Sequence, residues 1–216
     1  GDYAVCENAI AQAGAFVASD FGEFSDYLRL ALPLRGKAVT GNRVAAVSNA
    51  GYESVGMADS IRYRGAELVL PPFGARTEEA LAKILFDNRL DGLVDVENPL
   101  DLTPMTGDVA YADLIHEVLG DEGIDAAVVA IVPLPPALQT LPPGETYTES
   151  IDDPSSIAQR LPRAAAATDK PVIAVIDSGS LFDPLADALK SGGLPVFRSA
   201  DRAVRALCKW IDIKRN

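Results

Sequence analysis

From residue 42 onward, short apolar runs alternate with amphipathic segments, and this rhythm restricts the chain to a small set of folds. The runs are rich in Val, Ile and Leu without strict alternation, which is typical of strands buried on both faces of a parallel sheet. They span residues 43–48, 67–70, 125–132, 171–177 and 195–197. Repeated β-α units with right-handed crossovers predict an α/β fold, a flavodoxin-like doubly wound sheet of five parallel strands.

The segments between these runs have helical spacing of apolar residues, and several open with Ser, Thr or Asp at the capping position. The predicted helices span residues 53–64, 77–88, 108–119, 155–167, 183–191 and 200–212. Residues 1–40 also have helical spacing and are predicted to form a helical linker before a domain at 41–216. Two long connections, 91–107 and the proline-rich 133–155, suit either binding loops or surface insertions.

Composition narrows the classes of partner. The 216 residues are 48% hydrophobic, enough for a substantial core, and the formal net charge is −12. Without a cluster of basic residues, the chain is not expected to bind nucleic acid or an anionic membrane. Its longest apolar run, 126–134, is too short to span a bilayer, so we expect a cytoplasmic protein. Cys6 and Cys208 lie outside any metal-ligand spacing, so no metal site is predicted.

The turn after the first predicted strand is the strongest candidate site, because ligands of doubly wound sheets bind beyond the carboxyl ends of strands. Small residues there lead directly into a helix, whose open amides and dipole favour an anion. Gly51 permits close approach of a phosphoryl group, whereas Glu53 competes for the same amides. Tight packing alone also explains the small residues. The predicted phosphate-binding residues are Asn49, Ala50, Gly51, Tyr52, Glu53 and Ser54, with Ser48 in support.

A second predicted loop carries Asn98 and Asp101, whose polar side chains are expected to fix it against this turn. Asn and Asp beside proline are also ordinary turn formers. Asp177 follows a strand and suits a general base or a metal ligand, but a single acid in this place more often caps the next helix. His116, the only histidine, lies inside a predicted helix beside acidic residues and is expected to be a solvated surface residue. No catalytic residue is predicted.

Three segments carry a resemblance to a known family. They read Arg-Val-Ala-Ala-Val-Ser-Asn-Ala-Gly at 43–51, Asn-Pro-Leu-Asp-Leu at 98–102 and Pro-Val-Phe-Arg-Ser-Ala-Asp-Arg-Ala at 195–203. In this order and at these separations the chain resembles the nucleoside-diphosphate-forming acyl-CoA synthetases, relatives of succinyl-CoA synthetase and ADP-forming acetyl-CoA synthetase. Residues 9–14 also resemble the segment that follows the family's phosphorylated histidine.

The resemblance implies a succinyl-CoA-ligase-like flavodoxin domain from a larger enzyme. Its partners would be CoA-binding, phosphohistidine and ATP-grasp domains, on the same chain or on another subunit. A homodimer of this chain is a further alternative. CoA, ATP or ADP, and Mg would serve the complete enzyme, whereas this fragment is expected to hold no cofactor and to be inactive alone. Its turn at 49–54 would help to hold the phosphohistidine phosphate, with Asn98 and Asp101 bordering the site.

One departure from the family leaves an alternative open. Where relatives commonly carry Gly-Gly-Pro-Gly, this chain has Gly-Tyr-Glu-Ser at 51–54, which adds bulk and charge. These residues favour a docking or subunit-interface module without phosphate binding. Flavin-binding and receiver domains share the topology, but the residues that they require after their strands are not present in this sequence.

Overall fold

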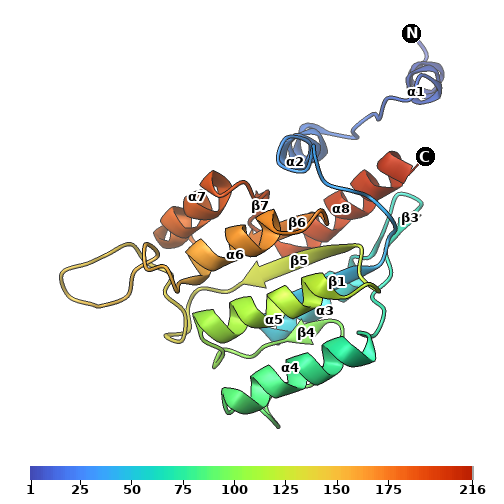
Figure 1. Cartoon of the computed structure of the whole chain (residues 1–216). Coiled ribbons are helices and arrows are strands. Elements are labelled where there is room, and N and C mark those ends of the chain that lie inside the picture. Colours follow the sequence, from blue (N-terminus) through green and yellow to red (C-terminus); the bar gives the residue numbers. More distant parts are fainter. Residues whose placement is uncertain (216) are drawn as a thin grey trace.

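The structure, a computed structural model, describes residues 1–215 and confirms the α/β fold with five parallel strands. The sheet has the order β4-β1-β5-β6-β7, and every neighbouring pair is parallel (Figure 1). The strands are β1 (Val44–Ser48), β4 (Leu100–Asp101), β5 (Ala126–Ile131), β6 (Val172–Ile176) and β7 (Val196–Phe197).

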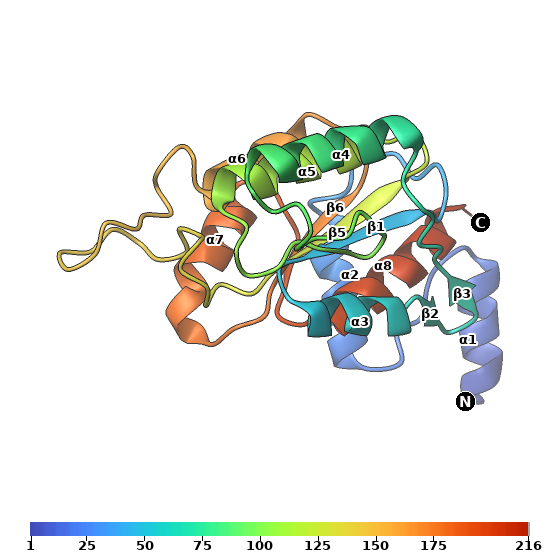
Figure 2. The ribbon, with the colours of Figure 1, turned by 90° about the horizontal axis from the view of Figure 1, so that it is seen from below.

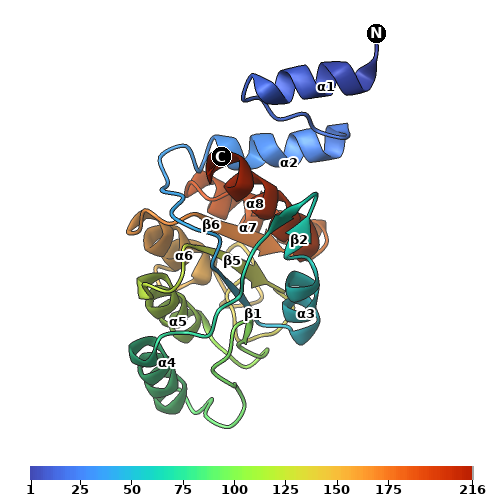
Figure 3. The same ribbon diagram turned by 90° about the vertical axis from the view of Figure 1, so that its right-hand side faces the viewer.

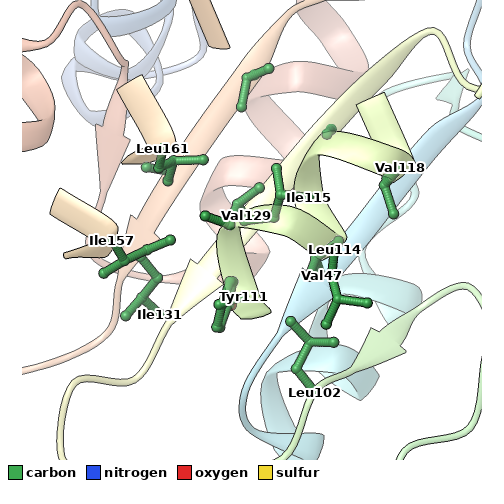
Figure 4. Close-up of a cluster of buried hydrophobic side chains, with 14 of the residues drawn as sticks. Val47, Leu102, Tyr111, Leu114, Ile115, Val118, Val129, Ile131, Ile157 and Leu161 are labelled. Atoms are coloured by element: carbon green, nitrogen blue, oxygen red, sulfur yellow. The ribbon is translucent and has the colours of Figure 1, made fainter. Parts of the chain in front are cut away.

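Helices cover both faces of this sheet (Figure 2). One face carries α4 (Ala75–Asp87), α5 (Asp108–Gly120), α6 (Ile157–Ala166) and α7 (Asp183–Ser191), which follows the short 3-10 turn Ser180–Phe182. The other face carries α2 (Phe21–Ala31), α3 (Gly51–Asp59) and α8 (Ala200–Arg215). Figure 4 shows part of the first core, where side chains of α5 and α6 lie against β1 and β5.

The predicted strand at 67–70 contributes only one isolated parallel bridge to the main sheet, between Val69 and Arg43, and is not one of its five strands. Residues Ala66–Glu67 form β3, which pairs antiparallel with β2 (Arg62–Tyr63). Arg64 and Gly65 between them both have positive φ, the condition of a tight type I′ hairpin turn. The hairpin also ends the predicted helix 53–64 early, at Asp59. The fifth strand is instead β4, inside the connection 91–107, where only two residues pair.

The edge of β1 that faces β4 is completed by three separate pieces of chain. Val69 accepts a hydrogen bond from the Val44 N–H at 2.7 Å, at the start of the strand. In the middle, the Asn98 side chain acts as a strand would: its Oδ1 accepts from Ala46 N at 3.0 Å and its Nδ2 donates to Val44 O at 2.9 Å. Beyond it, β4 pairs with the last two residues of β1.

The start of β1 is clamped by a buried carboxylate. Asp125 accepts hydrogen bonds from the Arg43 backbone, the Arg43 guanidinium and Thr40 Oγ1. The guanidinium holds the pKa of Asp125 at about 2. A Cβ at Gly41 would lie 2.2 Å from Asp125 Oδ2, so this position requires glycine.

The first two helices differ in how they meet the sheet domain. Leu30 and Leu34, in and just after α2, are buried in the core beside α8, and Arg202 of α8 donates two hydrogen bonds to the Asp26 carboxylate. By contrast, α1 (Tyr3–Gln12) has no buried residue and stands away from the sheet (Figure 3). Residues 1–40 thus contain two helices, of which α2 packs against its own chain.

The proline-rich connection 133–155 forms an arm without helix or strand, which projects from the body (Figures 1 and 2). One buried carboxylate holds both of its ends, because Asp108 accepts from Gln139 N at 2.9 Å and from Ile157 N at 2.6 Å. Among residues 1–215, no helix combines the length and the apolar character that crossing a bilayer requires.

Replacing Asn98 tests the completed edge of β1. Asn98→Ala leaves Ala46 N, Val44 O and Pro71 O without their partner, and should lower the free energy of unfolding by about 2 to 4 kcal/mol. Asn98→Asp keeps only the acceptor and should also be destabilised. Asn88→Ala, which removes an exposed hydrogen bond to Ile84 O, is the control and should cost under about 0.5 kcal/mol in urea unfolding. Equal losses at both asparagines would contradict this role.

Candidate functional site

The carboxyl ends of β1, β4 and β6 bring the turn at 49–54 together with Asp101 and Asp177. Helix α3 begins at Gly51, with only two residues between it and the end of β1. Its capping residue, Ala50, is extended and makes no side-chain hydrogen bond to the first turn. Because the first amides of a helix lack intrahelical partners, the Gly51 and Tyr52 N–H groups are open to a ligand.

Asp101 lies directly against this turn. A Cβ at Gly51 would lie 2.9 Å from Asp101 Oδ2, so the glycine admits this carboxylate beside the helix start. The other oxygen, Oδ1, accepts from Thr103 N at 3.0 Å. The structure therefore places the predicted residues Gly51 and Asp101 side by side, with a negative charge at the end of the helix that favours anions.

Two predicted residues hold the turn and the neighbouring loop in place through their side-chain amides. Asn49 is fully buried, accepts from Val132 N at 2.8 Å and donates to Val132 O at 3.0 Å, which ties the end of β1 to the end of β5. Asn98 is bonded to Val44 and Ala46 of β1 and to Pro71, so it fixes the second loop against the strand rather than against the turn itself. Neither amide faces the open helix start as a free group.

Ser48 and Glu53 form a buried pair under the turn. Ser48 Oγ accepts from Ala50 N at 3.1 Å and donates to Glu53 Oε2 at 2.9 Å. The carboxylate therefore bonds to a hydroxyl rather than to the helix amides for which the sequence expected it to compete. The sequence did not show that Glu53 would be buried, because a Glu in a first helical turn is usually exposed.

Glu53 is only 2% exposed, and its second oxygen, Oε1, has no hydrogen-bond partner. Burial and the nearby negative charge of Asp177 raise the pKa of Glu53 to about 7, against the opposing effect of the Ser48 hydrogen bond. The hydroxyls of Ser54 and Ser178 are also buried without a partner. Unsatisfied polar atoms therefore gather at this edge of the sheet.

Tyr52 lies across the rim of the site. It is 61% exposed, and its hydroxyl donates to Asp177 Oδ2 at 3.1 Å, joining α3 to the loop after β6. After β7, Arg198 pairs with Asp183 and donates to Ile176 O at the end of β6. The turn thus combines open amides with surrounding carboxyl groups, which suits a ligand of low negative charge.

In the described part of the chain, no group of three or more His, Cys, Asp or Glu side chains is placed to hold a metal ion. His116 is exposed on α5, as expected. Cys208 is buried with its Sγ 3.4 Å from Ile61 O, and burial raises its pKa to about 11. Cys6 is exposed on α1.

The shifted pKa of Glu53 predicts a pH-dependent stability. A carboxyl whose folded pKa is raised favours folding most below the unfolded pKa of 4.5, and loses that contribution as pH rises to about 7. Relative to Glu53→Gln, the wild type should lose about 3 kcal/mol of unfolding free energy across this window. Urea unfolding at several pH values measures it, with exposed Glu79→Gln as the control. A parallel pH profile for wild type and Glu53→Gln would contradict this environment.

Comparison with known proteins places these features in context. No protein-family model matches the chain. It is 27% identical over 218 residues to acetate–CoA ligase [ADP-forming] II subunit alpha of Pyrococcus furiosus, and 25% identical over 232 residues to trans-feruloyl-CoA synthase FCS1 of an unknown prokaryotic organism. These alignments cover 100% of this chain but 43% and 28% of the relatives.

Solved structures share the fold. PH0766 from Pyrococcus horikoshii OT3 superposes with a TM-score of 0.76 at 24% identity, over 99% of this chain and 45% of that one. A dinucleotide-forming acetyl-coenzyme A synthetase 1 of Ca. Korarchaeum cryptofilum, in complex with phosphate and ADP, gives 0.76 at 20% identity, over 100% and 42%. Over its whole length, therefore, the chain is similar to an ADP-forming acetate–CoA ligase subunit and to a feruloyl-CoA synthase, and it spans less than half of the length of each.

Proposed function

We propose that this chain is the section of an NDP-forming acyl-CoA synthetase that helps to hold the phosphoryl group carried by a histidine of another section. The complete enzyme would convert acyl-CoA, phosphate and NDP into acid, CoA and NTP in the cytoplasm. The observation that carries the proposal is the uncapped start of α3, with Gly51 as its first residue at the carboxyl edge of the sheet. The relationship to acetate–CoA ligase subunit alpha supports it.

In this proposal the chain does no covalent work. The hydrogen bonds of Asn49 and Ser48 fix the turn that carries the Gly51 and Tyr52 amides. These amides stabilise the negative charge on the phosphoryl oxygens while the phosphoryl group passes between acyl phosphate, histidine and nucleotide. CoA, ATP or ADP, and Mg would bind to the other sections, namely the CoA-binding, phosphohistidine and ATP-grasp domains. The chain alone would therefore show no turnover.

A docking role without phosphate is the second candidate, and an exposed apolar stripe favours it. One face of α2, together with the residue that follows the helix, presents large apolar side chains to solvent at helical spacing. Among them, Phe21 is 89% exposed. The stripe consists of Phe21, Phe24, Leu28 and Leu32. It would contact another section of the enzyme or a second copy of the chain, while the turn after β1 would serve only packing.

Phosphate titration separates the two candidates. We expect millimolar inorganic phosphate to shift the amide NMR signals of residues 51–54, because the Gly51 and Tyr52 N–H groups at the start of this turn are open. Gly51→Val should abolish this shift, because its side chain meets the Asp101 carboxylate beside the turn. Gly56→Val places the same β-branched residue in the same helix where a Cβ meets nothing within 4 Å, and it should retain the shift.

The outcome decides between a phosphoryl site and a docking module. Shifts that spread over the surface, or that survive unchanged in Gly51→Val, would contradict the proposed site. Absence of any shift at residues 51–54 in the wild type would favour the docking role. Circular dichroism of both variants verifies that the loss of binding does not follow from loss of the fold.

A further inference from the structure

The free oxygen of Glu53 belongs to the same first turn as the open amides. Glu53 is the third residue of α3, after Gly51 and Tyr52, and it is almost completely buried. Ser48 Oγ occupies only Oε2, which leaves Oε1 as a buried acceptor without a donor. Since buried polar groups are nearly always paired in folded proteins, this unpaired oxygen is a candidate contact for a ligand bound at the turn.

The groups around Glu53 are acidic or neutral. Asp177 faces it from the loop after β6, and on its own helix Tyr52 is directed to that same Asp177. Asp101 lies at the end of β4. Tyr111 of α5, fully buried, feels the charges of both Glu53 and Asp101, and its hydroxyl donates to Ala130 O. None of these groups supplies a proton donor to Oε1.

An anion that contacts both the open amides and Oε1 requires a proton between itself and this oxygen, because two unprotonated oxygens would repel each other in a buried site. We propose that Glu53 is a specificity-determining residue, which makes the α3 turn accept phosphoryl groups that share a proton with Oε1 and reject sulfate. This inference rests on the proposed function and adds the form in which the phosphoryl group is bound.

A comparison of phosphate binding with sulfate binding distinguishes proton sharing from simple anion binding. A phosphoryl group takes up its last proton near neutral pH, with a pKa of about 6 in phosphate esters. Sulfate has nearly the same size and shape but carries no proton at neutral pH. The carboxyl pKa of about 7 means that the Glu53–phosphoryl pair holds one proton under these conditions. Sulfate binds only when Glu53 itself is protonated.

Amide shifts of residues 51–54 would give the Kd of inorganic phosphate and of sulfate at about pH 8 and about pH 6. At the higher pH we expect the wild type to bind phosphate at least about tenfold more tightly, the effect of one charge-assisted hydrogen bond. Sulfate should gain about tenfold on going to the lower pH, as Glu53 takes up its proton.

Glu53→Gln is the decisive variant, because the amide keeps an oxygen for Ser48 and offers an N–H donor at the other position. It should bind sulfate and phosphate within about threefold of each other, and sulfate binding should lose its pH dependence. The exposed Glu79→Gln carries the same change in charge and should retain the wild-type preference. Equal binding of the two anions by the wild type, or an unchanged preference in Glu53→Gln, would overturn the inference.

These results also separate this inference from the proposed function. If neither anion shifts residues 51–54 in wild type or Glu53→Gln, both proposals fail. If both anions bind the wild type equally at this turn, the phosphoryl site stands and only the role of Glu53 fails. An N-phosphorylated imidazole should show the same preference over sulfate as inorganic phosphate. Failure of the imidazole compound alone would retain Glu53 selectivity but assign the turn to free phosphate rather than to a histidine-borne group.

Discussion

Strand β1 must be hydrogen-bonded along both edges, and the way in which this is achieved determines the geometry of the site. Its β5 edge is an ordinary ladder, whereas the opposite edge is completed by Val69, the Asn98 side chain and β4 in turn. Because β4 pairs only with the end of β1, Asp101 reaches the start of α3. The acidic character of the turn follows from this pairing.

The sequence allowed the central architecture to be predicted, because strands buried on both faces are continuous apolar runs. Residues 44–48, 126–131 and 172–176 fall within predicted strands for this reason. The edge strand could not be found in the same way. Strand β4 has only two paired residues, which is too short to show a periodicity in the sequence. A side-chain amide that takes the place of a strand, as that of Asn98 does, leaves no hydrophobic pattern either. The run at 67–70 looked like a strand, but the positive φ angles at Arg64 and Gly65 turn it back on Arg62–Tyr63.

The position of the candidate turn could be predicted, but the partners of its side chains could not. The rule that ligands lie beyond strand ends pointed to residues 48–54, and it does not depend on distant contacts. Asn49, however, bonds to Val132, a partner 83 residues away. Glu53 was expected to compete for the first-turn amides, and only the packed structure shows that it bonds to Ser48 instead. Its role as a buried acid therefore depends on tertiary packing alone.

The Asp108 carboxylate determines where this chain and its relatives can change in length. Its single carboxylate fixes the backbone at Gln139 and at Ile157, so the sheet and α6 are positioned independently of the segment between these residues. The entropy of closing a loop rises only with the logarithm of its length, by about 0.6 kcal/mol for each doubling. Insertions or deletions at the tip of the arm are therefore inexpensive. Relatives of this chain can vary in this region, and change the shape of the molecule there, without altering the edge that holds Gly51 and Glu53.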